Sequence, residues 1–467
     1  MRFRRKTFSS LALLAVVAGT SVGAVAGWPW ALPAAGAALI LYVGLEGWRA
    51  DLNGRMMLAA SVAAAGAAVL ALPDSGRVLA RALAEAASLV GLFTALSFMR
   101  QAAETSPLVK ECGDLMVRQP AGRRYLVLSL GSHLVSLVLN FGVLSLLGTM
   151  VMRGNTAEAA GGDQRIVAIR RQRMMTALLR GFSVMTVWSP LSVSFAVTQT
   201  VVHGLPWSRL LPLQMLLAAA QLALGWMMDR WAFPRVATAP GVDGGGGWAP
   251  LGRLALLILS VMVASVAVAE MLGLRMVMGA VLVVPAAGIV WLIARQGGGP
   301  ANAVVGAGGL LARRLTEILP GFATEVAMLG GGMFAGQVIA AFIAPAEVAR
   351  LIALMGLPPL VLTILLAWSV MILAQIGVSQ IVTVTILGSA LADLGRLGVD
   401  PLVLASGLMG AWALSACSTP VGAAILTISR LAGVPMRVVA RDWNGLYVLL
   451  GALLLAVWMA GLHWVLG

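Results

Sequence analysis

The sequence predicts an all-α polytopic membrane protein with about 11 transmembrane helices and two re-entrant hairpins, arranged as two inverted repeats. Of its 467 residues, 60% are hydrophobic and only 11% are charged, a balance that excludes an ordinary soluble globular protein. Many apolar runs reach roughly 18 residues, the length that crosses about 30 Å of hydrocarbon. Two of these runs carry a proline at corresponding places in the two halves, which is typical of transporter binding sites.

The net charge of +14 comes from basic residues in short segments between the apolar runs. The positive-inside rule accounts for these residues, so no nucleic-acid partner is expected. The basic start, Arg2 to Lys6, places the N-terminus in the cytoplasm, and we expect the protein in the inner membrane. The apolar run that follows is nearer to about 20 residues than to about 12, so residues 1–27 are expected to form an uncleaved first helix instead of a signal peptide.

The first repeat is expected to span residues 28–235. Straight helices are expected at about 29–48, 56–73, 79–99 and 209–228. A basic loop should run from Arg100 to Arg124. Both flanks of the next apolar stretch are basic, so about 125–152 is predicted to be a hairpin that enters and leaves from the cytoplasm, with Asn140 near its tip. A helix broken by proline is expected at about 174–203.

The second repeat is expected to span residues 253–467, after a Gly-rich cytoplasmic linker at 236–252. Its hairpin, about 360–391, has flanks poor in basic residues and should enter from outside. Its broken helix, about 402–433, runs inward, and the C-terminus is expected to be external. Straight helices are expected at about 254–273, 276–294, 315–343 and 444–466.

Several matches in the same order support an internal repeat. The matching positions are Leu79–Glu85 with Leu311–Glu317, where five of seven residues are identical, Asn140 with Gln380, Leu147–Thr149 with Leu387–Ser389, and Pro190 with Pro420. The first of these segments opens a helix from outside. Its partner should open a helix from inside, because a Gly-rich cytoplasmic loop with Arg313 and Arg314 is expected before it. The two repeats are therefore predicted to be inverted.

Such a repeat brings the two hairpin tips and the two helix breaks together near the membrane midplane. Half-helix N-termini suit an anion, and broken C-terminal ends suit Na⁺. No fixed basic side chain is evident there, so backbone amides are expected to recognise the anion. The candidate substrate- and ion-binding residues are Asn140, Gly142, Ser145, Ser189, Pro190, Ser192, Ser194, Gln380, Thr383, Thr385, Ser418, Thr419, Pro420 and Gly422.

Each hydroxyl group has a second interpretation, since Ser and Thr commonly hydrogen-bond between membrane helices. Glu325 is expected about ten residues into an apolar helix, and an ionisable group at that depth is a candidate proton or cation carrier. A carboxylate paired with a neighbouring helix is the alternative. Arg81 with Glu85, and Arg313 with Glu317, are expected to form structural i,i+4 pairs.

Residues 410–442, which include CSTPVGAAILTISRLAGVPMRVVARD, resemble the final broken helix of the large membrane subunit of tripartite periplasmic (TRAP) transporters. The order of helices and hairpins over residues 28–467 is similar to that of the ion transporter superfamily, which includes the divalent anion:sodium symporters. Val421 replaces the second proline of the TRAP motif, and the Ser-Asn-Thr hairpin signature of those symporters is absent. The resemblance implies an elevator-type secondary transporter, with carboxylates as the usual substrates.

These observations predict a secondary active transporter that moves an organic anion, with a carboxylate as the first choice, coupled to Na⁺ or H⁺. The alternatives are an inorganic-ion antiporter or exporter on the same fold, and a non-transporting assembly or sensor protein. The sequence has no nucleotide loop and no haem or zinc spacing, so neither enzymatic activity nor a cofactor other than a coupling Na⁺ is expected. The expected partners are the anionic substrate, the bilayer, a periplasmic binding protein or small membrane subunit, and a second copy in a homodimer.

Overall fold

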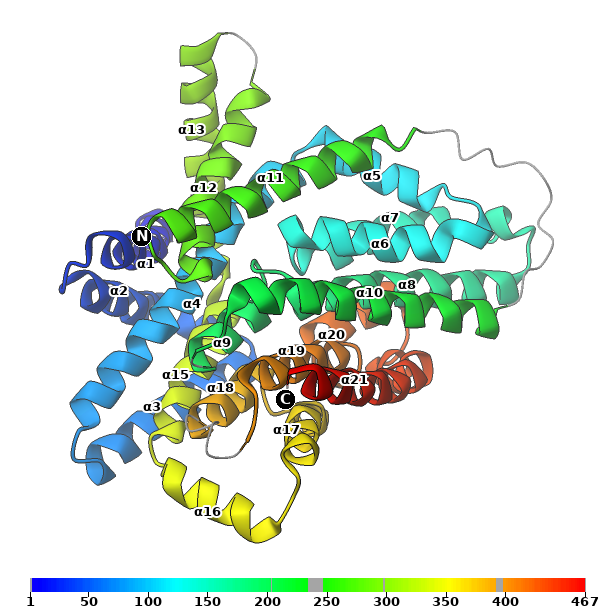
Figure 1. Ribbon diagram of the computed structural model, residues 1–467. Coiled ribbons are helices and arrows are strands. Elements are labelled where there is room, and N and C mark those ends of the chain that lie inside the picture. The colour runs from blue at the N-terminus through cyan, green and yellow to red at the C-terminus, as the bar shows by residue number, and fades with distance from the viewer. Residues whose placement is uncertain (1, 203, 234–246, 297–298, 392–397, 467) are drawn as a thin grey trace.

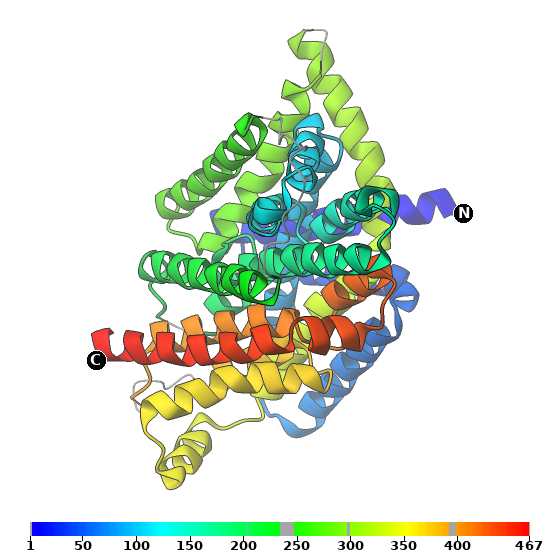
Figure 2. The same cartoon turned by 90° about the vertical axis from the view of Figure 1, so that its right-hand side faces the viewer.

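The computed structural model describes residues 2–202, 204–233, 247–296, 299–391 and 398–466, and the regular secondary structure of these residues is entirely helical. Among them, nine helices are long and apolar enough to cross a membrane, and up to eleven spans result if two bent helix pairs each count as one. The predicted all-α polytopic membrane fold is therefore confirmed. The two chain ends lie on opposite sides of the molecule (Figure 2), whereas the direction in which the chain crosses the bilayer stays a prediction.

The first half of the chain contains the predicted hairpin tip and helix break. Its helices are α1 (Arg2–Ala26), α2 (Ala31–Glu46), α3 (Leu52–Ala71), α4 (Ser75–Glu104), α5 (Pro107–Val117), α6 (Ala121–Leu139), α7 (Gly142–Gly154), α8 (Gln164–Trp188), α9 (Val193–Val201) and α10 (Trp207–Ala232). The first hairpin consists of α6 and α7, which meet at Asn140 and Phe141. The first break, Ser189–Ser192, separates α8 from α9. Both interruptions fall at the polar and proline residues that predicted them.

The second half repeats this order of elements. Its helices are α11 (Ala249–Met271), α12 (Met276–Ala294), α13 (Pro300–Ile318), α14 (Ala323–Val326), α15 (Gly332–Ala340), α16 (Pro345–Met355), α17 (Pro359–Gln375), α18 (Gln380–Ala390), α19 (Pro401–Ala416), α20 (Ala423–Ala432) and α21 (Gly445–Leu466). The second hairpin consists of α17 and α18. The second break, Cys417–Gly422, separates α19 from α20. After α1, both halves contain two straight helices, a long helical segment that is bent in the second half, a short helix, a hairpin, a broken helix and a final helix.

The expected loop from Arg100 to Arg124 is wrong, because most of it is helical. Helix α4 continues to Glu104, and α5 follows directly. In α5 the buried residues Val109, Cys112 and Met116 recur at helical spacing, and the charged residues take the opposite side. A charge-rich stretch can therefore be an amphipathic helix, and charge alone led to the wrong prediction here.

The expected Gly-rich loop before residue 315 is also wrong. Its place is taken by α13, which projects from the rest of the protein (Figure 1). Every fourth residue from Ala303 to Leu315 is buried, so the glycines between them do not prevent a helix. The single straight helix expected at 315–343 is instead bent by 60° around Leu319–Gly321, where Pro320 lacks an N–H group. Residues 236–246 of the expected linker lie outside the described residues, and its last residues begin α11.

The helices pack as two groups. The long-helix group contains α1 to α4, α11, α12 and α15, with α12 and α15 packed on α4. The broken-helix group contains α6 to α10 and α17 to α21, in which α8 packs on α10 and α19, and α19 packs on α21 (Figure 2). The groups meet most closely where α15 lies on α18. There a Cβ on Gly336 would lie 2.8 Å from Cβ of Thr385, so the two helices approach each other because Gly336 has no side chain.

Within the broken-helix group, each hairpin packs against the broken helix of the other half. Helix α7 lies on α20, and α18 lies on α9. A Cβ on Gly148 would lie 2.6 Å from Cδ1 of Leu431, and a Cβ on Gly388 would overlap the side chain of Val201. The sequence alignment pairs the two glycines, and each partner stands eleven residues after the proline of its break. These equivalent contacts are what a repeated structure produces, while the inversion of the repeats across the membrane stays a prediction.

Candidate functional site

The first break is closed by its own hydroxyl groups. Ser192 Oγ accepts a hydrogen bond from the Phe195 N–H at 3.2 Å, which caps α9, and donates to the Ser189 carbonyl at 2.7 Å. Ser189 Oγ accepts from the Leu191 N–H at 3.2 Å. Both serines are fully buried. Their hydroxyl groups satisfy the backbone where the helix is interrupted.

Pro190 leaves one carbonyl of α8 without its helical donor, because proline has no N–H group to give to Thr186 four residues earlier. The hydroxyl group of Ser194 donates to that carbonyl. Ser194 is itself fully buried. The hydroxyl groups of the first break therefore hydrogen-bond to the backbone. This agrees with the structural alternative to ligand binding that the sequence left open.

The second break is more open. Pro420 and Gly422 are half-buried, and 51% of Val421 is exposed. Gly422 occupies the position before α20 that Ser192 occupies before α9, and α20 has no side-chain cap. The first N–H groups of a helix have no partner within it, so those of α20 are left for water or a ligand. Thr419 Oγ1 donates to the Ser415 carbonyl at 2.6 Å and so satisfies the end of α19 only.

The second hairpin reaches this open break through two glutamines. Gln375, the last residue of α17, donates through Nε2 to Ser418 Oγ at 2.9 Å. Gln380, the first residue of α18, donates through Nε2 to Ser415 Oγ at 2.8 Å. The turn between them is tight, and Gly377 adopts φ of 90°, which favours glycine. Two amide groups from the hairpin helices therefore contact hydroxyl groups at the end of α19 and in the second break.

The first hairpin tip contacts the protein differently. Asn140 has φ of 49° at the turn, and the Phe141 ring lies 4.9 Å from the Phe182 ring of α8. A Cβ on Gly142 would lie 3.4 Å from Nε of Arg100, so a basic side chain of α4 lies at this tip. This position contradicts the expectation that no fixed basic group is near the hairpins. Ser145 is exposed on α7.

Two other candidates, Thr383 and Thr385, have contacts away from the second break. Thr383 donates to the Ser379 carbonyl within its own helix at 3.2 Å. Thr385 is fully buried, with Oγ1 3.7 Å from Sδ of Met333 on α15, which is a packing contact between the two groups.

Glu325 lies in α14, directly after the bend, beside Thr324, whose Oγ1 accepts from the Asp51 N–H at 3.0 Å. Because Asp51 is the capping residue directly before α3, Glu325 lies near the turn between α2 and α3. The expectation that it lies about ten residues into a straight helix is wrong. Its role in coupling stays a prediction.

Sequence reasoning missed Arg180 of α8, whose side chain is buried. Nε donates to Asn444 Oδ1 at 2.9 Å, Nη2 to the Trp443 carbonyl at 2.9 Å, and Nη1 to the Tyr125 hydroxyl at 3.2 Å. The guanidinium carbon also lies 4.4 Å from the centre of the Tyr447 ring. These partners are neutral, so the charge of Arg180 is solvated without a carboxylate. A lone charged residue in an apolar run was the signal that could have identified it.

The helical turn after Arg180 contacts the second break. Cys417 is the first residue of that break, and its Sγ donates to Oγ of Ser183 in this turn of α8 at 3.0 Å. On α8, the Trp188 indole N–H donates to His133 Nε2 at 3.0 Å. His133 therefore carries its proton on Nδ1, which faces the Gly181 carbonyl at 3.3 Å. These bonds tie α8 to α6 and to the end of α19.

The two expected i,i+4 pairs have different outcomes. Arg313 and Glu317 approach within 3.7 Å, as predicted. Glu85 pairs instead with Arg275, at 3.4 Å, from the turn between α11 and α12. The pairing of Glu85 with Arg81 is therefore wrong, because a tertiary neighbour replaces the local one.

Comparison with known proteins identifies no family. No protein-family model matches the chain, and no curated protein matches it either. Its structure is similar to that of the Alcanivorax borkumensis YdaH transporter, described as having an unusual topology, with a TM-score of 0.49 and 15% sequence identity over 87% of this chain and 98% of that chain. A likeness at this level identifies no function.

Proposed function

We propose that the protein is a secondary active transporter that carries a small organic anion, with a carboxylate as the preferred class, and that the anion binds at the second break. One observation supports this most directly. The start of α20 has no side-chain cap, and the second hairpin reaches the same break through Gln375 and Gln380. Irregular backbone at membrane depth is tolerated where it is buried in protein or lines a cavity. The first break is of the buried kind, and we assign ligand binding to the second.

The groups around the second break favour an anion. The free N–H groups and the dipole of α20 present partial positive charge. Gln375 and Gln380 each have a second Nε2 hydrogen, and Ser418 adds a neutral hydroxyl group, so these side chains can donate hydrogen bonds. Arg180 adds a buried positive charge to the same helix group, and its neutral partners leave that charge uncompensated.

The proposed mechanism is of the elevator type, as the resemblance to the ion transporter superfamily and to TRAP membrane subunits implies. The broken-helix group moves against the long-helix group and carries the anion with it. Na⁺ held by carbonyl groups at the end of α19, or a proton on Glu325, supplies the coupling. The inner membrane, a cytoplasmic N-terminus, an external C-terminus, and a periplasmic binding protein, small membrane subunit or second copy as partner belong to the same proposal.

Uptake by purified protein in liposomes tests this function. Radiolabelled succinate and acetate are offered with an inward Na⁺ gradient, an inward proton gradient, or neither. We expect uptake that depends on one gradient and falls about tenfold or more in the Gln380→Ala/Ser418→Ala double variant. Ser260→Ala, at an exposed hydroxyl group of α11, is the control and should leave uptake unchanged.

Other outcomes of this assay contradict the proposal in distinct ways. Carboxylate flux that ignores both gradients excludes coupling. Sulfate or phosphate flux without carboxylate flux identifies an inorganic-ion carrier. Folded protein that moves none of these solutes supports a non-transporting role.

A further inference from the structure

The start of α6, the start of α8 and the end of α10 lie together at one end of the broken-helix group (Figure 1). Arg124, in the first turn of α6, lies close enough to Arg170 and Arg173 of α8 for their charges to repel its own. We call these three residues the arginine cluster. All three are half-buried, so water screens their mutual repulsion less than it would at an open surface.

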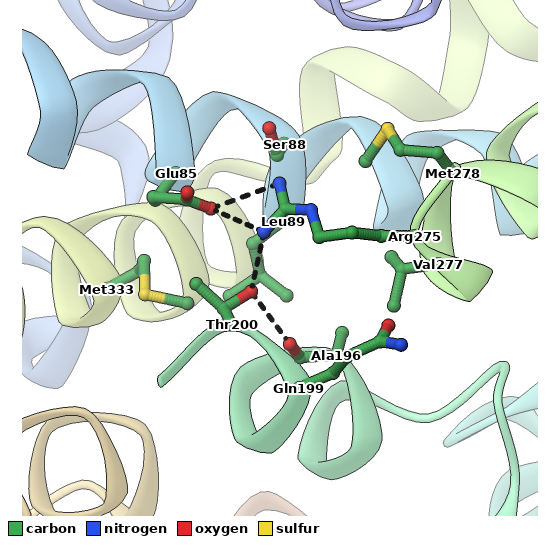
Figure 3. Close-up of a pocket in the computed structure, with 10 residues that line it drawn as sticks. All are labelled: Glu85, Ser88, Leu89, Ala196, Gln199, Thr200, Arg275, Val277, Met278 and Met333. Atoms are coloured by element: carbon green, nitrogen blue, oxygen red, sulfur yellow. Dashed lines mark hydrogen bonds and ion pairs between the residues drawn. The ribbon is translucent and has the colours of Figure 1, made fainter. Parts of the chain in front are cut away.

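Only part of this positive charge is compensated. Arg173 forms two parallel hydrogen bonds with Asp229 of α10, at 2.8 and 2.7 Å. In the long-helix group, Arg275 likewise faces a carboxylate, that of Glu85 (Figure 3). Arg124 differs, since within the described residues it forms no ion pair, and its one hydrogen bond runs from Nε to a backbone carbonyl at 2.8 Å. The two amino groups of its guanidinium are therefore available to an acceptor from outside the chain.

Aromatic side chains lie next to the cluster where α10 ends. The guanidinium carbon of Arg173 lies 5.3 Å from the centre of the Phe233 ring, and that of Arg230 lies 4.7 Å from the Trp226 ring. Trp231, directly after Arg230, is 81% exposed. Tryptophan is enriched where a membrane protein passes from hydrocarbon to water. The end of α10 therefore indicates that the arginine cluster lies at the level of the lipid headgroups.

We propose that the arginine cluster binds the phosphate group of an anionic phospholipid of the phosphatidylglycerol type. The phosphate oxygens accept hydrogen bonds from the two amino groups of Arg124, and Arg170 adds attraction by its charge. A bound negative charge also offsets the repulsion among the three arginines. A zwitterionic phospholipid such as phosphatidylcholine has no net charge and brings an ammonium group close to the same arginines, so it binds more weakly.

A free phosphate ion offers the same oxygens, but the surroundings of the cluster favour the lipid. The exposed indole of Trp231 can pack against the glycerol and first methylene groups of a phospholipid, whereas a bound ion leaves it uncovered. The site rests on the confirmed membrane fold. It depends neither on the predicted direction of the chain across the bilayer nor on the proposed transport activity.

Native mass spectrometry of the detergent-purified full chain tests the site, with phosphatidylglycerol and phosphatidylcholine of identical acyl chains and inorganic phosphate as probes. We expect phosphatidylglycerol to bind about fivefold or more tightly than phosphatidylcholine. Arg124→Gln should weaken phosphatidylglycerol binding about fivefold and the Arg124→Gln/Arg170→Gln double variant about 25-fold, since each arginine near an anionic lipid contributes about that factor. Phosphatidylcholine binding should change less than about twofold in both variants. Arg209→Gln, at an exposed residue in the first turn of α10 and thus at its other end, is the control and should change neither.

Three outcomes overturn the proposal. They are equal binding of the two lipids to the unaltered protein, unchanged phosphatidylglycerol binding in the double variant, and displacement of phosphatidylglycerol by an equal concentration of inorganic phosphate, which would assign the cluster to a soluble ion. If Arg124→Gln does not fold, Arg170→Gln alone takes its place and should weaken phosphatidylglycerol binding about fivefold. The measurement uses no substrate and no membrane gradient. Failure of carboxylate transport in liposomes therefore leaves this result standing, and failure here leaves the transport proposal standing.

Discussion

The two proline breaks share a design and differ in what closes them. Ser192 caps α9 with its hydroxyl group, whereas Gly422 at the equivalent place has no side chain to cap α20. Ser194 satisfies the carbonyl that Pro190 leaves without a donor. A proline break is thus not a ligand site by itself. Under the proposed function, the site needs both a helix start without a side-chain cap and other polar groups that reach it.

The two hairpins also differ in the contacts that they make at their tips. In the second half, Gln375 and Gln380 reach hydroxyl groups around the break. In the first half, the hairpin tip meets α8 through an aromatic contact between Phe141 and Phe182. The two hairpin tips therefore differ in kind: the first makes an aromatic contact and the second makes polar contacts.

The largest expected effect comes from removing the amide contacts of the second hairpin. Gln380→Ala combined with Gln375→Ala should lower carboxylate uptake by about 10- to 100-fold, since each of the two lost hydrogen bonds contributes about 0.5–1.5 kcal/mol net. Asn140→Ala, at the equivalent tip of the first hairpin, should lower uptake less than threefold, about 0.6 kcal/mol. The measurement is initial uptake in liposomes at equal protein content. Equal losses in the two halves would show that the sites are equivalent and the comparison wrong.

A serine introduced at Gly422 should close the second break. Gly422 has φ of −70°, which suits any residue, and a Cβ there would lie 3.2 Å from the nearest atom, the Thr419 carbonyl oxygen. The new hydroxyl group caps α20, so Gly422→Ser should raise the thermal midpoint slightly and weaken substrate affinity by about tenfold. Concentration-dependent uptake measures this affinity. A Gly422→Ser protein with unchanged affinity excludes the start of α20 as the anion site.

The exchange of partners between the halves predicts a pair of compensating substitutions. Gly388→Ala should destabilise the protein by about 1–3 kcal/mol, because its Cβ overlaps Val201, and adding Val201→Ala should restore much of that loss. Gly148→Ala should cost less, since the flexible end of Leu431 can move. Thermal unfolding of the two single variants and the double variant in detergent gives the coupling energy. Simple additivity for Gly388 and Val201 would mean that α18 and α9 do not touch.

Most of the fold that could be predicted from the sequence was predicted from local features. Apolar runs located the spans, and proline or glycine within them located the breaks and the first hairpin tip, because both residues act on the backbone where they stand. Where basic charge was used, as for α5, or glycine content together with charge, as for α13, helices were mistaken for loops. The unbroken helix expected around Glu325 was wrong, because a bend at Pro320 lies only a few residues before it.

Much of the candidate site was less predictable, because it depends on residues far apart in the sequence. Gln375 and Ser418 are 43 residues apart, and Glu85 and Arg275 are 190 apart. Arg180 was visible as an isolated charge, but its partner Asn444 lies 264 residues away. The difference between Ser192 and Gly422 was present in the sequence. It acquired meaning only when the structure showed both at the start of a half-helix.

The smallest expected effect is at Ser192. Ser192→Ala removes the cap of α9 and the bond to the Ser189 carbonyl, so the protein should lose about 1–2 kcal/mol of stability. Substrate affinity should stay unchanged, because these contacts satisfy the backbone and reach no ligand. Thermal unfolding and concentration-dependent uptake, measured on the same preparation, separate the two quantities. A tenfold weaker affinity at normal stability would show that the first break also contributes to substrate binding. The contrast between the two breaks would then be wrong.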